Sequence, residues 1–350
     1  MLTKKLVGRR VICVVKSDAY GHGAVEISRR LNECGADFFA VATIDEAMEL
    51  RRSGIFGGIL ILGYVLPEFI EYAVSNDISL TAASCDALSA IANASHGRQA
   101  KVHIKLNTGM NRTGFDVCRK DSTEELIKAA AILKENPNII VEGIFSHFAR
   151  AEDDSEFSRL QFENYQKGCR YFEGLGITPI IHHICNSAGL LRYDGMRLDA
   201  VRLGITLYGC SDDKAFGYKP AMSFKTTVVD VHDIRKGDGV SYGLAFKAEK
   251  DMKMAVIGAG YADGLTRQLS CGKGRVLCHG VSAPIIGRVC MDMAMIDASA
   301  VPSIKVGDEV TIWGRDGDEI LTCDEQAQSA GTISYELLCG VSKRVPRIYI

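Results

Sequence analysis

Short apolar runs alternate with amphipathic stretches over roughly the first 210 residues of the chain. Eight of these runs predict strands, at residues 11–15, 38–42, 59–62, 78–81, 102–106, 139–145, 180–185 and 201–203. Apolar residues at three- and four-residue spacing predict helices between them, at residues 24–34, 44–52, 123–135 and 157–175. Alternating strands and helices predict a parallel sheet. Eight repeats favour a closed (β/α)8 TIM barrel, with a doubly wound open sheet as the alternative.

The pattern changes after about residue 216. Strand-like runs follow one another there with Gly-Asp and Gly-Lys turns between them, at residues 224–231, 254–257, 281–286, 294–296 and 309–312. Two helical stretches come late, at residues 324–330 and 334–338. The sequence therefore predicts an α/β barrel domain over residues 1–215 and a mostly β C-terminal domain over residues 216–350.

Composition describes an ordinary soluble globular protein, with 24% charged residues, 47% hydrophobic residues and a formal net charge of -2. No basic block marks a nucleic-acid partner, and the apolar runs are too short to span a membrane. The twelve cysteines are scattered without a C-x-x-C pair, which predicts free thiols in a reducing cytoplasm. His182 and His183 face opposite sides of a strand, so we expect no metal site there.

Chemically useful residues recur where the predicted strands end, which is where barrels carry their active sites. Lys16 ends the first strand, and a loop with Lys105 and Arg112 follows the fifth. His147 closes the sixth strand, Ser187 follows the seventh, and Arg202 lies on the eighth. Each has an ordinary alternative, such as a helix cap for the segment at Ser187 or a buried core histidine for His147. Together they predict one reactive rim.

Lys16 stands between a buried apolar run and a glycine-rich turn. Burial lowers the pKa of a lysine towards the nucleophilic form that makes imines, although a strand-end lysine more often reaches solvent. The loops after strands seven and eight commonly hold phosphate in barrels, and here they offer the Ser187 hydroxyl and the amides of Gly204 and Ile205. Tyr20 is within reach from the first loop. A phosphate and an imine-forming lysine predict pyridoxal 5'-phosphate.

Arg202 is the candidate partner of the cofactor's pyridine nitrogen. Because arginine stays protonated, it would leave that nitrogen unprotonated and make the ring a weaker electron sink. Such a ring favours simple proton exchange.

These residues resemble the cofactor-attachment motif of bacterial alanine racemases, Val-Val-Lys16-Ser-Asp-Ala-Tyr20-Gly-His-Gly. The likeness continues in order through residues 108–112, 145–149, 201–209, 240–243, 287–292 and 331–336. The resemblance implies a pyridoxal-phosphate barrel with a C-terminal β domain, assembled as a head-to-tail homodimer with shared active sites. It also implies interconversion of L- and D-alanine, which supplies D-alanine for cell-wall peptidoglycan.

The resemblance assigns the two bases that racemisation requires, one on each face of the substrate α-carbon. Lys16 would hold the cofactor and move the proton on the D-isomer side. Tyr242, delivered by the other subunit, would act on the L-isomer, although taken alone it reads as an ordinary strand aromatic.

The remaining roles implied by the resemblance concern binding. Arg112 would contact the cofactor's phenolic oxygen and the substrate carboxylate, and the backbone of Met291 would contact substrate from the second subunit. His147 would support Arg202. The phosphate would be held by Tyr20, Ser187, Gly204, Ile205 and Tyr335. Lys105 aligns with a lysine that is carbamylated in some relatives, with an ordinary ion pair or a solvent-facing lysine as the alternative.

Two departures from the family pattern stand out. The family usually carries a further strand before the lysine strand, so we expect either a trimmed form or the cytoplasmic part of a longer membrane protein. Membrane-bound serine racemases of vancomycin-resistant bacteria have that arrangement. Asn107 replaces the aspartate that usually precedes the threonine of its motif, which predicts a weaker local charge network.

The substrate and the reaction leave alternatives. Tyr335 narrows the pocket and favours alanine over serine, and a serine or mixed alanine/serine racemase is the second choice. A related decarboxylase would pair the ring nitrogen with an acid, which Arg202 argues against. A non-catalytic pyridoxal-phosphate protein would lack the β domain that carries Tyr242 and Met291.

Overall fold

The computed structural model describes residues 8–119, 123–153, 155–210 and 218–350. The chain divides into two compact units, and the first ends at Leu207. The second begins at Tyr208 and also takes in residues 20–22. The domain boundary that the sequence predicts at residue 215 lies outside the described residues.

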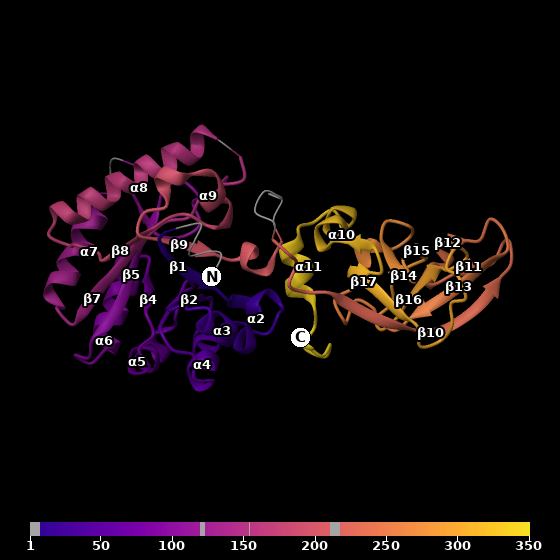
Figure 1. Ribbon diagram of the computed structural model, residues 1–350. Helices are drawn as coiled ribbons and strands as arrows, with labels where there is room; N and C mark the ends of the chain where they lie inside the picture. The colour runs from indigo at the N-terminus through magenta and orange to yellow at the C-terminus, as the bar shows by residue number, and fades with distance from the viewer. Residues whose placement is uncertain (1–7, 120–122, 154, 211–217) are drawn as a thin grey trace. The chain divides into compact units, whose positions relative to one another are not determined.

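Eight parallel strands form the first unit, and Figure 1 shows them in indigo to magenta with helices packed around them. Their order in the sheet is β3-β2-β1-β9-β8-β7-β5-β4, and a parallel bridge between Leu60 and Ser79 joins the two ends. The sheet therefore closes on itself in chain order, which confirms the barrel and excludes the open sheet. The strands are β1 (Arg10–Val14), β2 (Phe38–Val41), β3 (Gly58–Ile61), β4 (Leu80–Ala82), β5 (Ala100–Asn107), β7 (Ile139–Phe145), β8 (Ile181–His183) and β9 (Ala200–Leu203).

Helices follow the strands of the barrel, and their first turns are capped by short polar side chains. Thr43 and Glu46 form a capping box at the start of α4, Ser84 caps α6, and Ser155 caps α8. The helices are α3 (Ala24–Glu33), α4 (Ile44–Arg52), α5 (Pro67–Ser75), α6 (Cys85–Ala94), α7 (Thr123–Glu135), α8 (Glu156–Gly174) and α9 (Ser187–Arg192). The helix ranges given from the sequence correspond to α3, α4, α7 and α8, and α5, α6 and α9 are further helices between the strands.

The second unit is an antiparallel sheet in the order β10-β13-β16-β15-β14-β17-β18. Strand β10 also pairs with β17, so six of these strands close into a small barrel. The strands are β10 (Phe224–Ile234), β13 (Met252–Ile257), β14 (Arg275–Cys278), β15 (Val281–Ile286), β16 (Ala294–Asp297), β17 (Glu309–Asp316) and β18 (Glu319–Leu321). The hairpin of β11 (Gly239–Val240) and β12 (Phe246–Lys247) and helices α10 (Cys323–Ala330) and α11 (Ser334–Gly340) complete the unit. The sequence interpretation included the two helices but missed β14, β18 and the hairpin.

Three features are absent from the part of the chain that the structure describes. No helix there has the length and apolar character needed to cross a bilayer. No group of three or more histidine, cysteine, aspartate or glutamate side chains lies in an arrangement that would hold a metal ion. None of the twelve cysteines, all of which are described, forms a disulfide bond.

Candidate active site

Five of the predicted site residues gather in the first unit, at the carboxyl ends of its strands. Lys16 follows β1, Lys105 lies near the end of β5 with Arg112 in the loop beyond it, His147 follows β7, and Arg202 lies on β9. Burial, together with the positive charges of Arg112, Arg202 and Lys16, lowers the pKa of Lys105 to about 8. The side chains therefore share one electrostatic environment, as the rim hypothesis predicted.

The rim is positively charged. Burial lowers the pKa of His147 well below its ordinary value, and the charges of Arg202, Arg112, Lys105 and Lys16 act in the same direction. His147 is therefore neutral at physiological pH. No carboxylate appears among the groups that set the pKa of His147 or of Lys105. An anion bound at this rim would be stabilised by the surrounding positive charges.

The chain turns in an unusual way directly after Lys16. In α2 (Lys16–Tyr20), the four residues that follow the lysine have φ angles of 52° to 54°, in the left-handed region. This conformation costs about 1–2 kcal/mol for each non-glycine residue. Three hydrogen bonds hold the turn: Ser17 N–H to Glu46 Oε1 at 2.6 Å, Ala24 N–H to Asp18 Oδ1 at 2.7 Å, and Ala19 N–H to Val15 O at 2.9 Å. The strained turn ends β1 and fixes the backbone position of Lys16.

Arg202 is almost fully buried, with 3% of its surface exposed. One terminal nitrogen donates to His183 Nδ1 at 2.7 Å, and the other donates to His147 Nδ1 at 3.1 Å and to Ser146 O at 2.6 Å. Within the described residues, its Nε makes no hydrogen bond. The guanidinium is thus held at both ends while Nε remains available to a ligand. Sequence reasoning missed His183 as a partner, because it had treated that histidine only as a metal ligand to be excluded.

The loops after β8 and β9 meet through hydroxyl groups. Ser187 Oγ accepts from the amide of Gly204 at 3.1 Å and lies 3.0 Å from Thr206 Oγ1. This segment also contains a helix cap, as the alternative interpretation expected: the side chain of Asn186, next to Ser187, accepts from the amide of Gly189 and caps α9. Ile205 follows Gly204 and is buried. Thr206 was not among the predicted residues, although it lies in the same 201–209 motif as Gly204 and Ile205.

Asn107 organises the loop that carries Arg112. Its Oδ1 accepts from the amides of Gly109 at 3.2 Å and Asn111 at 2.9 Å, and its Nδ2 donates to Asn111 Oδ1 at 3.0 Å. An aspartate would accept the same amides but would lack the donor. The asparagine is therefore a structural organiser of this loop. Arg112 itself is exposed.

Tyr20 and Tyr335 lie together within the second unit. Their ring centroids are 5.8 Å apart, and the ring centroid of Tyr208 lies 4.9 Å from that of Tyr20. Burial raises the pKa of Tyr20, and Tyr335 raises it further. Tyr20 is therefore a neutral hydroxyl donor.

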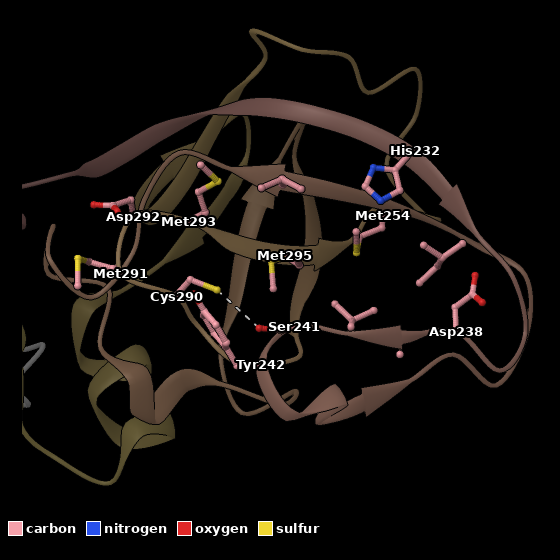
Figure 2. A pocket seen from close by; sticks show the side chains of 14 residues that line it. His232, Asp238, Ser241, Tyr242, Met254, Cys290, Met291, Asp292, Met293 and Met295 are labelled. Carbon is pink, nitrogen blue, oxygen red and sulfur yellow. Dashed lines mark hydrogen bonds between the residues drawn. The ribbon is translucent and has the colours of Figure 1, made fainter.

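Tyr242 and Met291 line one pocket of the second unit, which has a volume of about 820 Å³ (Figure 2). Tyr242 is 70% exposed and Met291 is 54% exposed. Ser241, just before the tyrosine, has φ 67° and ψ −177°, a conformation that is nearly confined to glycine. Its Oγ donates to Arg288 O at 2.6 Å and lies 3.6 Å from Cys290 Sγ, so the residue before Tyr242 is held in place.

The fold and site together define a (β/α)8-barrel protein with a cationic rim and a C-terminal antiparallel β domain. Residues 1–212 match the family model "Alanine racemase, N-terminal domain", and residues 221–349 match "Alanine racemase, C-terminal domain". The chain therefore belongs to the alanine racemase family.

Individual relatives agree with this assignment. The alanine racemase of Methanococcus maripaludis is 42% identical over 97% of this chain and 92% of its own length. That of Clostridium tetani is 42% identical over 98% of this chain and 89% of its own length. The crystal structure of alanine racemase from Streptomyces lavendulae has a TM-score of 0.93 at 34% identity, covering 100% of this chain and 93% of that one. The Bacillus anthracis enzyme with bound L-Ala-P has a TM-score of 0.91 at 35% identity, covering 99% and 90%.

The electrostatic coupling on the rim is open to a direct test. Arg112→Gln removes one positive charge beside Lys105, so the pKa of Lys105 is expected to rise towards its ordinary value, because a like charge disfavours the protonated amine. NMR titration of the lysine side chains after 13C-methylation measures it. Arg119→Gln, which removes an exposed arginine that is not among the groups acting on Lys105, is the matched control. A Lys105 pKa that stays at about 8 in Arg112→Gln would contradict the coupling.

Proposed function

We propose that this protein is a pyridoxal-phosphate-dependent alanine racemase that interconverts L- and D-alanine and supplies D-alanine for cell-wall peptidoglycan. The observation that carries the proposal is family membership across both domains, in a chain whose Lys16 and Arg202 lie on one cationic rim. The side chains to which the resemblance assigns the reaction are present in this chain.

The residues on the rim suit the cofactor. The phosphate and the phenolic oxygen are anionic, and the charged groups that act on Lys105 and His147 at the rim are all positive. The Arg202 Nε, which has no hydrogen bond within the described residues, suits the pyridine nitrogen. When bound, pyridoxal 5'-phosphate draws electrons from the substrate α-carbon and so acidifies its proton. Ser187, Gly204 and Ile205 would hold the phosphate, and Tyr20 and Tyr335 remain further phosphate contacts predicted from the sequence.

The chain's own residues would then move one proton on each face of the α-carbon. Lys16 carries the cofactor and exchanges the proton of the D-isomer, and Tyr242 exchanges that of the L-isomer. Arg112 holds the substrate carboxylate, and the backbone of Met291 contacts the substrate. We propose that Tyr242 and Met291 reach the rim from a second copy of the chain, which makes the enzyme a homodimer with shared active sites.

Carbamylation of Lys105 is a further part of the proposal. Carbon dioxide adds to an amine only in its neutral form, and the pKa of about 8 leaves a larger neutral fraction than an ordinary lysine has. The added carboxylate would lie among Arg112, Arg202 and Lys16, the charges that now act on Lys105. An unmodified lysine remains the alternative.

Alanine is the substrate that we propose, since the similar relatives named above are alanine racemases. A serine racemase is the alternative, with less support. Arg202 in place of an acid speaks against a decarboxylase. We also propose a cytoplasmic location, because the described cysteines, all twelve of them, lack disulfide bonds.

The proposed activity is tested by incubating the pyridoxal-phosphate-loaded protein with L-alanine and detecting D-alanine with a D-amino-acid oxidase. Lys16→Ala is expected to lose the activity and the visible absorbance of the lysine-bound cofactor. Lys134→Ala, which removes an exposed lysine at the end of α7, should keep both. A wild-type protein that forms no D-alanine would overturn the function. An unchanged spectrum in Lys16→Ala would overturn the role of that lysine.

Shared active sites are tested by mixing two inactive variants. Lys16→Ala supplies an intact Tyr242, and Tyr242→Phe supplies an intact Lys16. After subunits exchange at random, half of the dimers are mixed and each has one intact site, so the mixture should recover about a quarter of the wild-type activity. Each variant mixed with itself should recover none. A mixture that stays inactive while mass spectrometry detects mixed dimers would rule out sites shared in this way.

Substrate choice is tested at Tyr335. Replacing this phenol by the smaller amide in Tyr335→Asn is expected to raise the kcat/KM for serine relative to that for alanine, because the smaller side chain leaves room to bind a hydroxyl. Assays with both amino acids on both proteins measure the ratio. Tyr349→Asn, at another half-exposed tyrosine, should leave it unchanged. An unchanged ratio in Tyr335→Asn would remove the argument from Tyr335.

A further inference from the structure

A chain of hydrogen-bonded side chains connects Arg202 to Glu142 through the interior of the first unit. Arg202 bonds to His183 Nδ1 at 2.7 Å, and His183 Nε2 lies 2.8 Å from His103 Nδ1. His103 Nε2 lies 3.0 Å from Glu142 Oε2, which also accepts from Ser79 Oγ at 2.5 Å. Both histidines have 0% of their surface exposed. Apart from Arg202, the proposed mechanism uses none of these side chains.

Only one arrangement of protons satisfies the whole chain. A guanidinium has no acceptor, so Arg202 must donate and His183 Nδ1 must carry a lone pair. The proton of a neutral His183 is then on Nε2, which donates to His103 Nδ1. The proton of a neutral His103 is on Nε2 in turn, and it donates to the Glu142 carboxylate. Each imidazole is thus held in one tautomer by its neighbours.

The pKa shifts agree with two neutral imidazoles between two charges. Burial lowers the pKa of His183, and Arg202 lowers it further. Burial also lowers the pKa of His103, although Glu142 opposes the shift. For Glu142, burial raises the pKa, but the hydrogen bonds from His103 and Ser79 outweigh it and leave the carboxyl ionised. Among the described residues, no carboxylate contacts Arg202 directly, and Glu142 is the carboxylate at the far end of the chain of hydrogen bonds.

The backbone is shaped to accommodate this chain. Strand β5 pairs with β7 in register from Ala100 to Val102, and the register then shifts so that His103 lies opposite Gly143. Glu142 is the extra residue of this bulge, and bulges commonly redirect a side chain beside a functional site. A Cβ on Gly143 would lie 2.4 Å from His103 Nδ1, so only glycine leaves room for the imidazole.

We propose that His183, His103 and Glu142 are positioning residues for Arg202. Their fixed tautomers present a single acceptor to the guanidinium, and the carboxylate at the far end balances its charge. Together they hold the plane of the guanidinium and therefore the direction of its Nε. The inference rests on the proposed function, because the direction of Nε matters for catalysis only if it meets the cofactor's ring nitrogen.

The proton arrangement is tested by 15N NMR of the histidine side chains in the pyridoxal-phosphate-loaded protein, which requires no activity. We expect both histidines as neutral Nε2–H tautomers. In Glu142→Gln, the resonances of His183 should shift, although that residue does not touch Glu142. Ser79→Ala removes a single bond to Glu142, leaves the chain intact and should shift His183 much less. An Nδ1–H tautomer at either histidine, or an unmoved His183 in Glu142→Gln, would overturn the proposal.

A second experiment tests the positioning role by measuring kcat. Glu142→Gln and His103→Leu are each expected to lower kcat for alanine about 10- to 100-fold, the range for losing a hydrogen bond to a charged group. His103→Gln keeps one acceptor and one donor, and it should recover most of the activity that His103→Leu loses. If the histidine only filled space, leucine would serve at least as well as glutamine. Equal activity of the two variants would therefore overturn the positioning role.

The two proposals fail separately. A wild-type protein without racemase activity overturns the proposed function, while the NMR measurement still decides the proton arrangement. An active wild type whose Glu142→Gln variant keeps full kcat overturns the positioning role and leaves the function standing. If His103→Leu does not fold, Glu142→Gln and His103→Gln still test the positioning role.

Discussion

The site depends on the burial of one positive charge, the guanidinium of Arg202. A buried ion is tolerated only when its hydrogen bonds are satisfied, since moving it from water costs several kcal/mol. The barrel meets this requirement with the carbonyl oxygens of Ser146 and Ile184 and with two neutral imidazoles. The ring of Phe145 adds a face 5.2 Å from the guanidinium carbon. These partners follow or end β7 and β8, so satisfying one charge fixes the ends of neighbouring strands relative to one another.

The same charge sets the chemistry of its surroundings. Arg202 lowers the pKa values of Lys105, His147 and His183, in each case after the larger effect of burial. A neutral His147 can accept from Arg202, whereas a protonated one would repel it. Burial lowers the pKa of Arg202 itself to about 10, which still leaves it charged at neutral pH. The cationic rim is therefore a consequence of how the barrel is packed as much as of which residues line it.

Much of this arrangement is visible in the sequence, because buried parallel strands are continuous apolar runs and barrels concentrate chemistry at the ends of those runs. Lys16, His147 and Arg202 were predicted as site residues in this way. Glu142 and His103 were not, because they lie inside strands and their role depends on a bulge, for which the apolar pattern carries no signal. The left-handed turn after Lys16 was also hidden, since the side chains that hold it are Glu46, which lies on α4, and Asp18 within the turn.

Both proposed bases, Lys16 and Tyr242, are adjacent in sequence to strained backbone, and at each of them the strain limits where the base can lie. Four residues with positive φ follow Lys16, and Ser241 with φ 67° precedes Tyr242. Such conformations cost about 1–3 kcal/mol each and persist only where the surroundings determine them. The hydrogen bond from Ser17 N–H to Glu46 holds the turn after Lys16, and the hydrogen bond from Ser241 Oγ to the carbonyl of Arg288 holds Ser241. Each base must reach one hydrogen atom on one face of the substrate α-carbon, so a backbone with few alternative conformations favours its function. The strained turns lower the stability of the fold, and in return they limit the positions that the Lys16 amine and the Tyr242 phenol can take.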